Sequence, residues 1–194
     1  MSDSWDNFAD SWDDNPDVIE YSKKAFESLG QYVNPAGLDV LDFGCGTGLL
    51  TEKLAAMASS VVAVDTSEKM IAVLKNKQIK NVTAFACDIS LKSIEQHPIL
   101  ASGFDLIVAS SVCAFVPEYD KTLAEIKHLL KKGGMFVQWD WKRSHEDDDF
   151  GFSQDIIARA YDKAGLSIVD VSETFSMSNE QGTMQVLVGV AKKD

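Results

Sequence analysis

A chain of 194 residues with 45% hydrophobic and 25% charged residues can bury a core without disulfides or metals, which excludes a largely disordered protein. Its longest apolar runs are far shorter than the roughly 20 residues of a membrane-spanning helix, so no membrane span is expected. The formal net charge is -12, and since a phosphate-rich partner requires a basic surface, we expect no nucleic-acid partner.

Neither the cysteines nor the first residues indicate export or metal binding. Cys45, Cys87 and Cys113 are widely spaced, form no CxxC pair and have no histidine cluster nearby, so we expect structural thiols and no metal site. The opening MSDSWDNFADSW is acidic and aromatic and lacks the basic and apolar regions of a signal peptide. We therefore expect a cytoplasmic protein.

The first predicted element is a helix that begins near residue 16. Asn15 and Pro16 are favourable residues for the N-cap and first helical positions. Small and apolar residues follow at helical spacing, at Val18, Ser22, Ala25, Phe26, Leu29 and Val33. We assign residues 1–35 to an N-terminal cap and residues 36–194 to the core of a single domain.

From residue 38 onward, short β-branched runs alternate with helical patterns, which is typical of βαβ units and a mostly parallel sheet. Seven strands are predicted, at residues 38–43, 61–65, 82–87, 104–109, 135–139, 167–175 and 183–191. The last two are separated only by the polar stretch 176–182, without a helix. We therefore expect them to form an antiparallel hairpin.

Two later helices have clear C-terminal signals. Apolar residues on one helical face end at Leu130, and the sequence KKGG at 131–134 then predicts the end of the helix and a turn. A second helix contains Ile156, Ile157, Ala160, Tyr161 and Ala164 and should end at Lys163 and Gly165.

The stretch VLDFGCGTGLLT at 40–51 places three glycines between a predicted strand and a helix. Glycines at this point let the backbone approach a ligand closely, at the carboxyl end of the sheet. A nicotinamide-binding turn has the spacing GxGxxG, whereas this chain has GxGxG, with Leu49 in the place of the third glycine. By itself, the stretch predicts a nucleotide site without specifying the nucleotide.

Acidic residues at the ends of the next two strands extend this site. Asp65, in VVAVDTS, follows Gly44 by 21 residues and can accept hydrogen bonds from both ribose hydroxyls. Asp88, in FACDIS, can accept from an adenine amino group while the backbone N–H of Ile89 meets a ring nitrogen. Small residues in IVASSVCAF, at the end of the fourth strand, leave room for a ligand.

Together, the pattern D-x-G-x-G-x-G at 42–48, Asp65, Asp88 and FDLIVASS resemble the class I S-adenosylmethionine-dependent methyltransferases, of the small-molecule group known as methyltransferase type 11. The resemblance covers residues 38–140, and LLKKGGMFV at 129–137 matches the segment before their fifth strand. It implies an α/β fold, a Rossmann-like three-layer sandwich with an N-terminal helical cap. The implied seven-stranded, mostly parallel sheet has the order 3-2-1-4-5-7-6, with strand 7 antiparallel.

The same resemblance implies how the cofactor S-adenosyl-L-methionine is held. The glycine turn passes under its methionine part, Asp65 holds the ribose, and Asp88 with Ile89 brackets the adenine. FADSWDDNP resembles the A-x-x-(Tyr/Trp)-D segment of small-molecule members, so that Trp12 covers the sulfonium, where an aromatic face favours a cation. Simple packing of the cap is the alternative for Trp12. The implied cofactor-binding residues are Trp12, Asp42, Gly44, Cys45, Gly46, Asp65, Thr66, Asp88, Ile89 and Ser110.

The implied reaction transfers a methyl group in line to a small organic acceptor, mainly through proximity and orientation, and leaves S-adenosyl-L-homocysteine. The Asn/Asp-Pro-Pro-Tyr motif of enzymes that methylate nucleobase amines and glutamine amides is missing after the fourth strand, which argues against those acceptors. His145 is a candidate general base, with an exposed loop histidine as the alternative. Walls for the acceptor are expected from residues 5–21, 112–117 and 141–152.

Two other functions are left open by the sequence. A non-catalytic module could use the same pocket to bind S-adenosylmethionine or S-adenosylhomocysteine. An NAD-dependent oxidoreductase is the third possibility, although Leu49 interrupts the nicotinamide fingerprint and no Tyr-x-x-x-Lys sequence is found.

Overall fold

The computed structural model describes residues 5–145, 150–179 and 182–194. The strands are β1 (Asp39–Phe43), β2 (Ser60–Asp65), β3 (Val82–Ala86), β4 (Phe104–Ser110), β5 (Leu130–Trp141), β6 (Ser167–Asn179) and β7 (Gly182–Lys192). The α-helices are α2 (Pro16–Leu29), α3 (Leu49–Ala55), α4 (Glu68–Asn76), α5 (Leu91–Gln96), α6 (Tyr119–Leu129) and α7 (Gln154–Ala164). Short 3-10 helices are η1 (Ala9–Asp14), η2 (Pro98–Ser102) and η3 (Cys113–Phe115).

The strands form one sheet in the order β3-β2-β1-β4-β5-β7-β6, as predicted. The first five strands of the chain, β1 to β5, pair with their neighbours in parallel, whereas β7 is antiparallel to both β5 and β6. The first connection that reverses direction along the sheet leads from β3 across to β4, on the other side of β1. In parallel sheets of this kind, ligands bind at such a switch point, outside the carboxyl ends of the strands.

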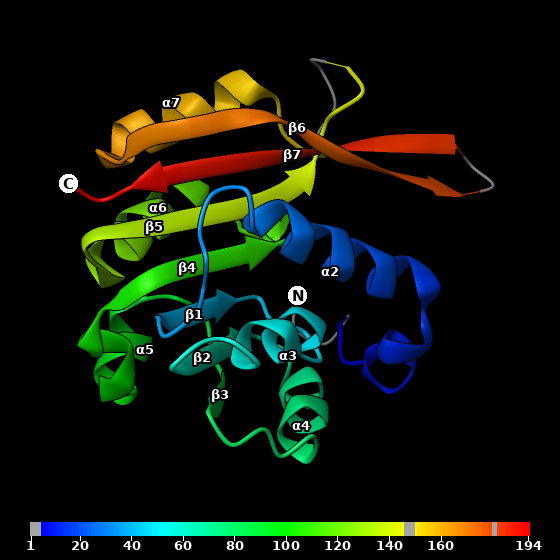
Figure 1. Cartoon of the computed structure of the whole chain (residues 1–194), viewed down its shortest axis with the longest axis vertical. Helices are drawn as coiled ribbons and strands as arrows, with labels where there is room; N and C mark the ends of the chain where they lie inside the picture. Colours follow the sequence, from blue (N-terminus) through cyan, green and yellow to red (C-terminus); the bar gives the residue numbers. More distant parts are fainter. Residues whose placement is uncertain (1–4, 146–149, 180–181) are drawn as a thin grey trace.

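Helices cover both faces of the sheet (Figure 1), because the side chains of the central strands are buried on both sides. Val40 and Leu106 pack in one buried cluster with residues of α2 and α3. Leu41 and Ile107, their chain neighbours, point to the opposite face and pack with residues of α6 and α7. The three-layer architecture is therefore confirmed.

Helix boundaries follow the predicted caps. The side chain of Asn15 accepts a hydrogen bond from the backbone N–H of Asp17 at 3.0 Å, and Pro16 occupies the first turn of α2. Gly165, with φ of 69°, ends α7 in the left-handed conformation expected of a glycine at that position. No helix in the described residues combines the length and the apolar character that crossing a membrane requires.

The KKGG segment forms part of β5, and the predicted turn after α6 is wrong. Strand β5 begins at Leu130, which pairs with Phe104, whereas the next pair joins Leu106 to Met135. The intervening residues form a bulge in which Gly133 has a φ of 81°. A side chain on Gly134 would lie 2.8 Å from the carbonyl oxygen of Phe104. The two glycines thus permit an irregular strand. The sequence KKGG does not show whether its glycines serve a strand bulge or the turn after a helix.

The terminal hairpin is longer than predicted. Most of the polar stretch 176–182 belongs to strands, since β6 continues to Asn179 and β7 begins at Gly182. Backbone pairing needs no apolar side chains, and a cross-strand bond at 2.8 Å between the hydroxyls of Ser178 and Thr183 suits the polar sequence. The paired ends run past the end of β5, beside α2 (Figure 1).

Candidate functional site

A cavity of about 1240 Å³ lies at the carboxyl ends of the parallel strands. Its volume exceeds the range of roughly 300–1,000 Å³ that is usual for a single small ligand, so it has room for two molecules side by side. All ten predicted cofactor-binding residues line it, namely Trp12, Asp42, Gly44, Cys45, Gly46, Asp65, Thr66, Asp88, Ile89 and Ser110. The fold therefore gathers into one place residues that the sequence spreads over almost a hundred positions.

The glycine turn between β1 and α3 is packed so closely that two of its glycines leave no space for a side chain. A Cβ atom on Gly44, whose φ is 71°, would lie 2.2 Å from Cγ2 of Val112. A Cβ atom on Gly48 would lie 2.4 Å from Cδ1 of Leu74. At Gly46 the nearest atom to such a Cβ is Nε1 of Trp12, at 3.5 Å, so the Trp12 indole covers the middle of the turn.

Asp65 joins the glycine turn to the end of β2. Its Oδ2 accepts a hydrogen bond from the backbone N–H of Gly46 and its Oδ1 from that of Ser67, both at 2.9 Å. Burial raises the pKa of this carboxyl, and the bonds from backbone N–H groups partly offset the increase. Each oxygen retains a lone pair. A carboxylate held in this way can accept from the two hydroxyls of a ribose, so the donor set fits the predicted cofactor.

Asp42 lies beneath the turn and is fully buried. Its pKa is raised to about 7, mainly by burial and to a smaller extent by the charge of Asp65, while the hydrogen bond from Thr51 opposes the increase. The Thr51 hydroxyl donates to Oδ2 of Asp42 at 2.6 Å, which ties α3 to β1. This hydrogen bond thus joins the two elements that flank the glycine turn.

Asp88 and Ile89 follow β3 and form the side wall of the cavity. Oδ1 of Asp88 accepts hydrogen bonds from the hydroxyls of Ser90, at 2.9 Å, and Ser93, at 2.6 Å. These contacts fix the loop against the start of α5, which Ser90 caps. Ile89 is buried, so its backbone position is set by packing against the core.

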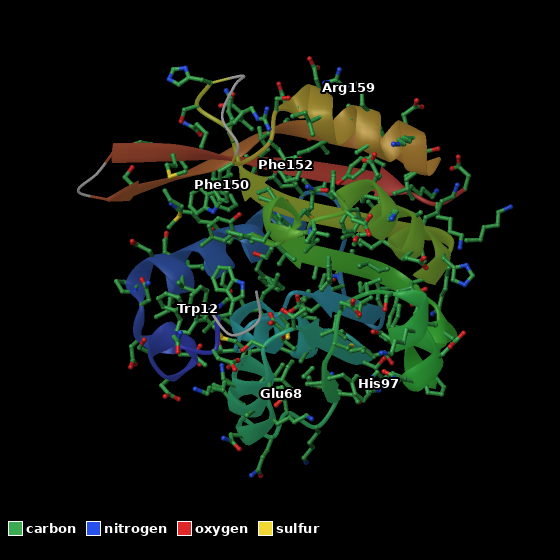
Figure 2. All side chains as sticks on the ribbon, turned by 180° about the vertical axis from the view of Figure 1, so that it is seen from behind. Trp12, Glu68, His97, Phe150, Phe152 and Arg159 are labelled. Atoms are coloured by element: carbon green, nitrogen blue, oxygen red, sulfur yellow. The ribbon has the colours of Figure 1, made fainter. Side chains whose placement is uncertain are left out.

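Acidic side chains attach the N-terminal segment to the cofactor side of the cavity. Oδ1 of Asp13 accepts from the hydroxyl of Thr47 at 2.5 Å, and Lys77 lies 2.7 Å from the other carboxylate oxygen. Oδ1 of Asp6 accepts from the hydroxyl of Ser67 at 2.5 Å. Figure 2 labels Trp12 beside this blue N-terminal segment. Two acidic residues of the N-terminus, Asp6 and Asp13, thus have a structural use.

Two of the three segments predicted as acceptor walls line the cavity. The N-terminal residues and the loop after β4 line the cavity, including Trp5, Val18, Tyr21, Val112 and Phe115. Of the third segment, 141–152, only Trp141 is among the described lining residues, and positions 146–149 lie outside the described residues.

The β6–β7 hairpin supplies a wall that sequence analysis missed. Met177, Ser178, Gly182 and Met184 line the cavity. The polar pattern around them favoured a loop, and Met177 and Met184 were the apolar residues that could have indicated a ligand-facing wall.

His145 is exposed in the loop after β5 and does not line the cavity, so its role as a base stays a prediction. His97 packs on the ring of Phe85, with centroids 4.3 Å apart, and Figure 2 labels it well away from Trp12. Burial raises the pKa of the Cys113 thiol well above its ordinary value, which disfavours a nucleophilic thiolate. Within the described residues, no group of three or more His, Cys, Asp or Glu side chains could hold a metal ion.

A second buried carboxyl group, which sequence analysis missed, lies behind the loop that follows β4. Asp140 accepts from the backbone N–H of Ala114 at 3.2 Å and from Nε2 of Gln138 at 2.9 Å. Oε1 of Gln138 accepts in turn from the hydroxyls of Tyr119, at 2.5 Å, and Tyr161, at 2.9 Å. Burial raises the pKa of Asp140 to about 7. This network positions the wall that carries Val112 and Phe115.

Comparison with known sequences agrees with these features. A protein-family profile described as "Methyltransferase domain" matches residues 41–138, half of the chain. The ubiquinone biosynthesis O-methyltransferase of Xanthomonas axonopodis pv. citri (strain 306) is 30% identical over 121 residues, which cover 62% of this chain and 47% of that protein. The chain spans about half the length of the curated relatives it matches.

Solved structures share the fold. A SAM-dependent methyltransferase from Aquifex aeolicus has a TM-score of 0.76 at 19% identity, over 100% of this chain and 99% of that one. The N-methyltransferase NodS from Bradyrhizobium japonicum WM9, in complex with S-adenosyl-L-homocysteine, has a TM-score of 0.66 at 20% identity, over 93% and 89%. With the profile match, the strand order and the glycine turn in agreement, the chain belongs to the methyltransferase-domain family, of the class I S-adenosylmethionine-dependent type.

Proposed function

We propose that the protein transfers a methyl group from S-adenosyl-L-methionine to a small organic acceptor, leaving S-adenosyl-L-homocysteine. The observation that carries this proposal is the single cavity in which all ten predicted cofactor residues meet a second set of aromatic and apolar walls. A module that only bound the cofactor would not need the second set. The matching family profile and the relatives named above are methyltransferases, which favours this function over an NAD-dependent oxidoreductase.

The residues that would hold the cofactor follow from the geometry of the turn. The Asp65 carboxylate would accept from the ribose hydroxyls, and the residues 88–89 would bracket the adenine. Backbone atoms of Gly44 and Gly46 would lie against the methionine part, under the indole of Trp12. When bound, S-adenosylmethionine supplies a methyl group activated by a positively charged sulfur.

The protein must also hold the accepting atom in line with the bond from the sulfur to the methyl group, and it must exclude water. Among the described residues that line the cavity there is no histidine. We therefore assign the rate enhancement mainly to proximity and orientation, which alone can supply roughly 7–11 kcal/mol in favourable model reactions.

We also propose that residues 1–194 form a single methyltransferase domain, with 1–35 as its cap and 36–194 as its core. Tyr21, Ala25 and Leu29 of α2 support this division, because they share a buried cluster with strands of the sheet. We place the protein in the cytoplasm and expect no nucleic-acid partner, consistent with three free cysteines and a net charge of -12.

Calorimetric titration with S-adenosylmethionine, S-adenosylhomocysteine and NAD tests the cofactor. We expect the two adenosyl compounds to bind and NAD not to bind. Asp65→Ala should weaken S-adenosylhomocysteine binding by roughly 2 kcal/mol, about 30-fold, because it removes charged hydrogen bonds to two hydroxyls. Asp39→Ala is the matched control, since Asp39 lies at the opposite end of β1 and pairs with Lys131. Binding of NAD alone, or unchanged affinity in Asp65→Ala, would show the proposal to be wrong.

A further inference from the structure

Along the outer part of the β6–β7 hairpin, apolar and polar residue pairs alternate. Phe175 pairs with Val186, and Met177 pairs with Met184 two positions further along. Because residues two apart in a strand lie on the same face, these two pairs form one apolar face of the hairpin. The pairs of the other face are polar, namely Ser176 with Gln185 and Ser178 with Thr183.

This apolar face leads from the core into the wall of the cavity. Val186 is fully buried, and the ring of Phe175 packs edge to face on that of Tyr21, with centroids 5.3 Å apart. The next pair, Met177 and Met184, lines the cavity. The last pair between β5 and β7 joins Trp141 to Val186, so Met184 lies beyond the end of β5, and it is 43% exposed. The described residues therefore cover this end of the apolar face only in part.

Helix α2 lies beside this part of the hairpin (Figure 1). Val18 and Tyr21, one helical turn apart, both line the cavity. Two polar contacts set the distance between helix and hairpin. Nζ of Lys24 donates to the carbonyl oxygen of Ser176, and the hydroxyls of Ser28 and Thr174 are hydrogen bonded, each at 2.9 Å. We call the wall formed by Val18, Tyr21, Met177 and Met184 the hairpin end of the cavity.

Charged side chains line other parts of the cavity. Apart from the aspartates of the cofactor site, the charged residues among the described lining are Asp17, Lys92, Glu118, Lys121 and Glu125. The hairpin contributes none of them, and Asp17, in the first turn of α2, is exposed and can stay hydrated. Because both signs of charge are present elsewhere, they leave the charge of the reacting group of the acceptor open. The hairpin end itself favours an apolar ligand group.

We propose that the hairpin end binds a hydrocarbon part of the acceptor, and that the acceptor carries a chain of several carbon atoms on its reacting group. The cofactor is polar and charged, and none of its predicted residues belongs to α2 or the hairpin, so the acceptor is the ligand that fits this wall. The inference rests on the proposed function, because it takes the cavity to be shared between cofactor and acceptor. Met177 and Met184 are positioning residues, and their flexible side chains suit hydrocarbon groups of varied shape.

Two probes that differ only in chain length test the inference. Protein saturated with S-adenosylhomocysteine is titrated calorimetrically with para-ethylphenol and with para-hexylphenol, which has four more methylene groups. Full burial of one methylene group strengthens binding roughly fourfold. Since the hairpin end is partly open to water, we expect para-hexylphenol to bind at least about 30-fold more tightly than para-ethylphenol.

Variants of the methionines separate the hairpin end from other apolar surface. Met177→Gln and Met184→Gln keep the length of the side chain but make its end polar, and each should lower the ratio of the two affinities at least about threefold. The ratio is the readout because a general distortion of the cavity would weaken both probes together. Met57→Gln is the matched control: Met57 is 42% exposed, as Met184 is, but does not line the cavity, so the ratio should not change.

The outcomes distinguish this inference from the proposed function. If the wild-type protein does not bind S-adenosylhomocysteine, the proposed function itself is wrong. If it does, the inference alone is overturned when para-hexylphenol binds no more tightly than para-ethylphenol, when both methionine variants keep the wild-type ratio, or when Met57→Gln lowers it equally. Sedimentation velocity supplies a further check. A wild-type dimer that Met184→Gln dissociates would show that a second copy of the chain covers this face, which would also overturn the inference.

Discussion

Gly44 and Gly37 have the same left-handed backbone but differ in what a side chain would meet. Their φ angles are 71° and 75°. A Cβ atom on Gly44 would lie 2.2 Å from Val112, whereas nothing lies within 4 Å of one on Gly37. At Gly37 only the backbone conformation favours a glycine, whereas at Gly44 both the backbone conformation and the close packing require one.

Gly37→Ala should lower the free energy of unfolding by about 1 kcal/mol, the usual cost of a left-handed alanine. Gly44→Ala should cost more, because Val112 and the loop after β4 must move, and it should also weaken S-adenosylhomocysteine binding. Urea unfolding and calorimetry measure the two effects. Equal losses of stability with equal affinities would mean that only the backbone conformation requires a glycine at position 44.

For single residues, motif spacing along the chain is enough to assign Gly44, Asp65 and Asp88 to one site, and all three line the cavity. The same spacing does not single out Tyr21 or Ser22. These two residues of α2 lie in an ordinary amphipathic helix pattern, and the sequence does not say which residues of that helix line the cavity. That property depends on neighbours from β5 and β6 that are distant in the chain.

Among the elements, the described part of the N-terminal segment is attached to the cofactor side by polar contacts of Asp6 and Asp13. Asp13 bonds to Thr47 and Lys77, and Asp6 bonds to Ser67. These contacts are partly exposed, so each contributes little to global stability. They nevertheless hold Trp12 over the glycine turn, and we expect cofactor binding to depend on them more than folding does.

Asp13→Ala should weaken S-adenosylhomocysteine binding a few-fold while lowering the free energy of unfolding by less than about 1 kcal/mol. Asp10→Ala provides the control, since Asp10 belongs to the same 3-10 helix, is exposed and carries the same charge. Calorimetry and urea unfolding of both variants give the comparison. An equal loss of affinity in Asp10→Ala would point to net charge instead of the contact with Thr47.

The order of the elements followed from hydrophobic periodicity, but the ends of two of them did not. KKGG predicts a helix end followed by a turn. Helix α6 does end, at Leu129, but KKGG itself is a bulge in β5, because Leu130 pairs with Phe104 of β4. The polar stretch 176–182 reads as a loop, and most of it is strand because the backbone pairs across the hairpin. In both cases a long-range hydrogen-bond partner overrode the local preference.

For the whole molecule, two buried carboxyl groups determine how stability depends on pH. Burial raises the pKa of both Asp42 and Asp140 to about 7. An unfolded aspartate has a pKa of about 3.9, so between these values the folded protein binds more protons than the unfolded chain. The free energy of unfolding should therefore rise as the pH falls through 7, because the folded protein then takes up protons at these two groups.

Between pH 8 and pH 6, each of these groups should add about 1 kcal/mol to the free energy of unfolding. Asp140→Asn should remove one such contribution and flatten the dependence, as measured by urea unfolding at several pH values. Histidine titration and general charge repulsion are common to both proteins and cancel in the comparison. If the variant shows the same change between pH 8 and pH 6 as the wild type, Asp140 does not titrate in that range.

The sequence by itself indicated the fold class, because strand and helix patterns alternate along it, whereas the strand order and the cofactor residues followed from the resemblance that its motifs carry. Only the tertiary structure decided how the predicted acceptor side is completed, because the β6–β7 hairpin supplies a wall that no motif predicted. That side is built where α2, the loop after β4 and the end of the β6–β7 hairpin meet, and contacts such as that of Lys24 with Ser176 join residues more than a hundred positions apart. No spacing rule connects such residues, since their proximity is a product of how the whole sheet packs.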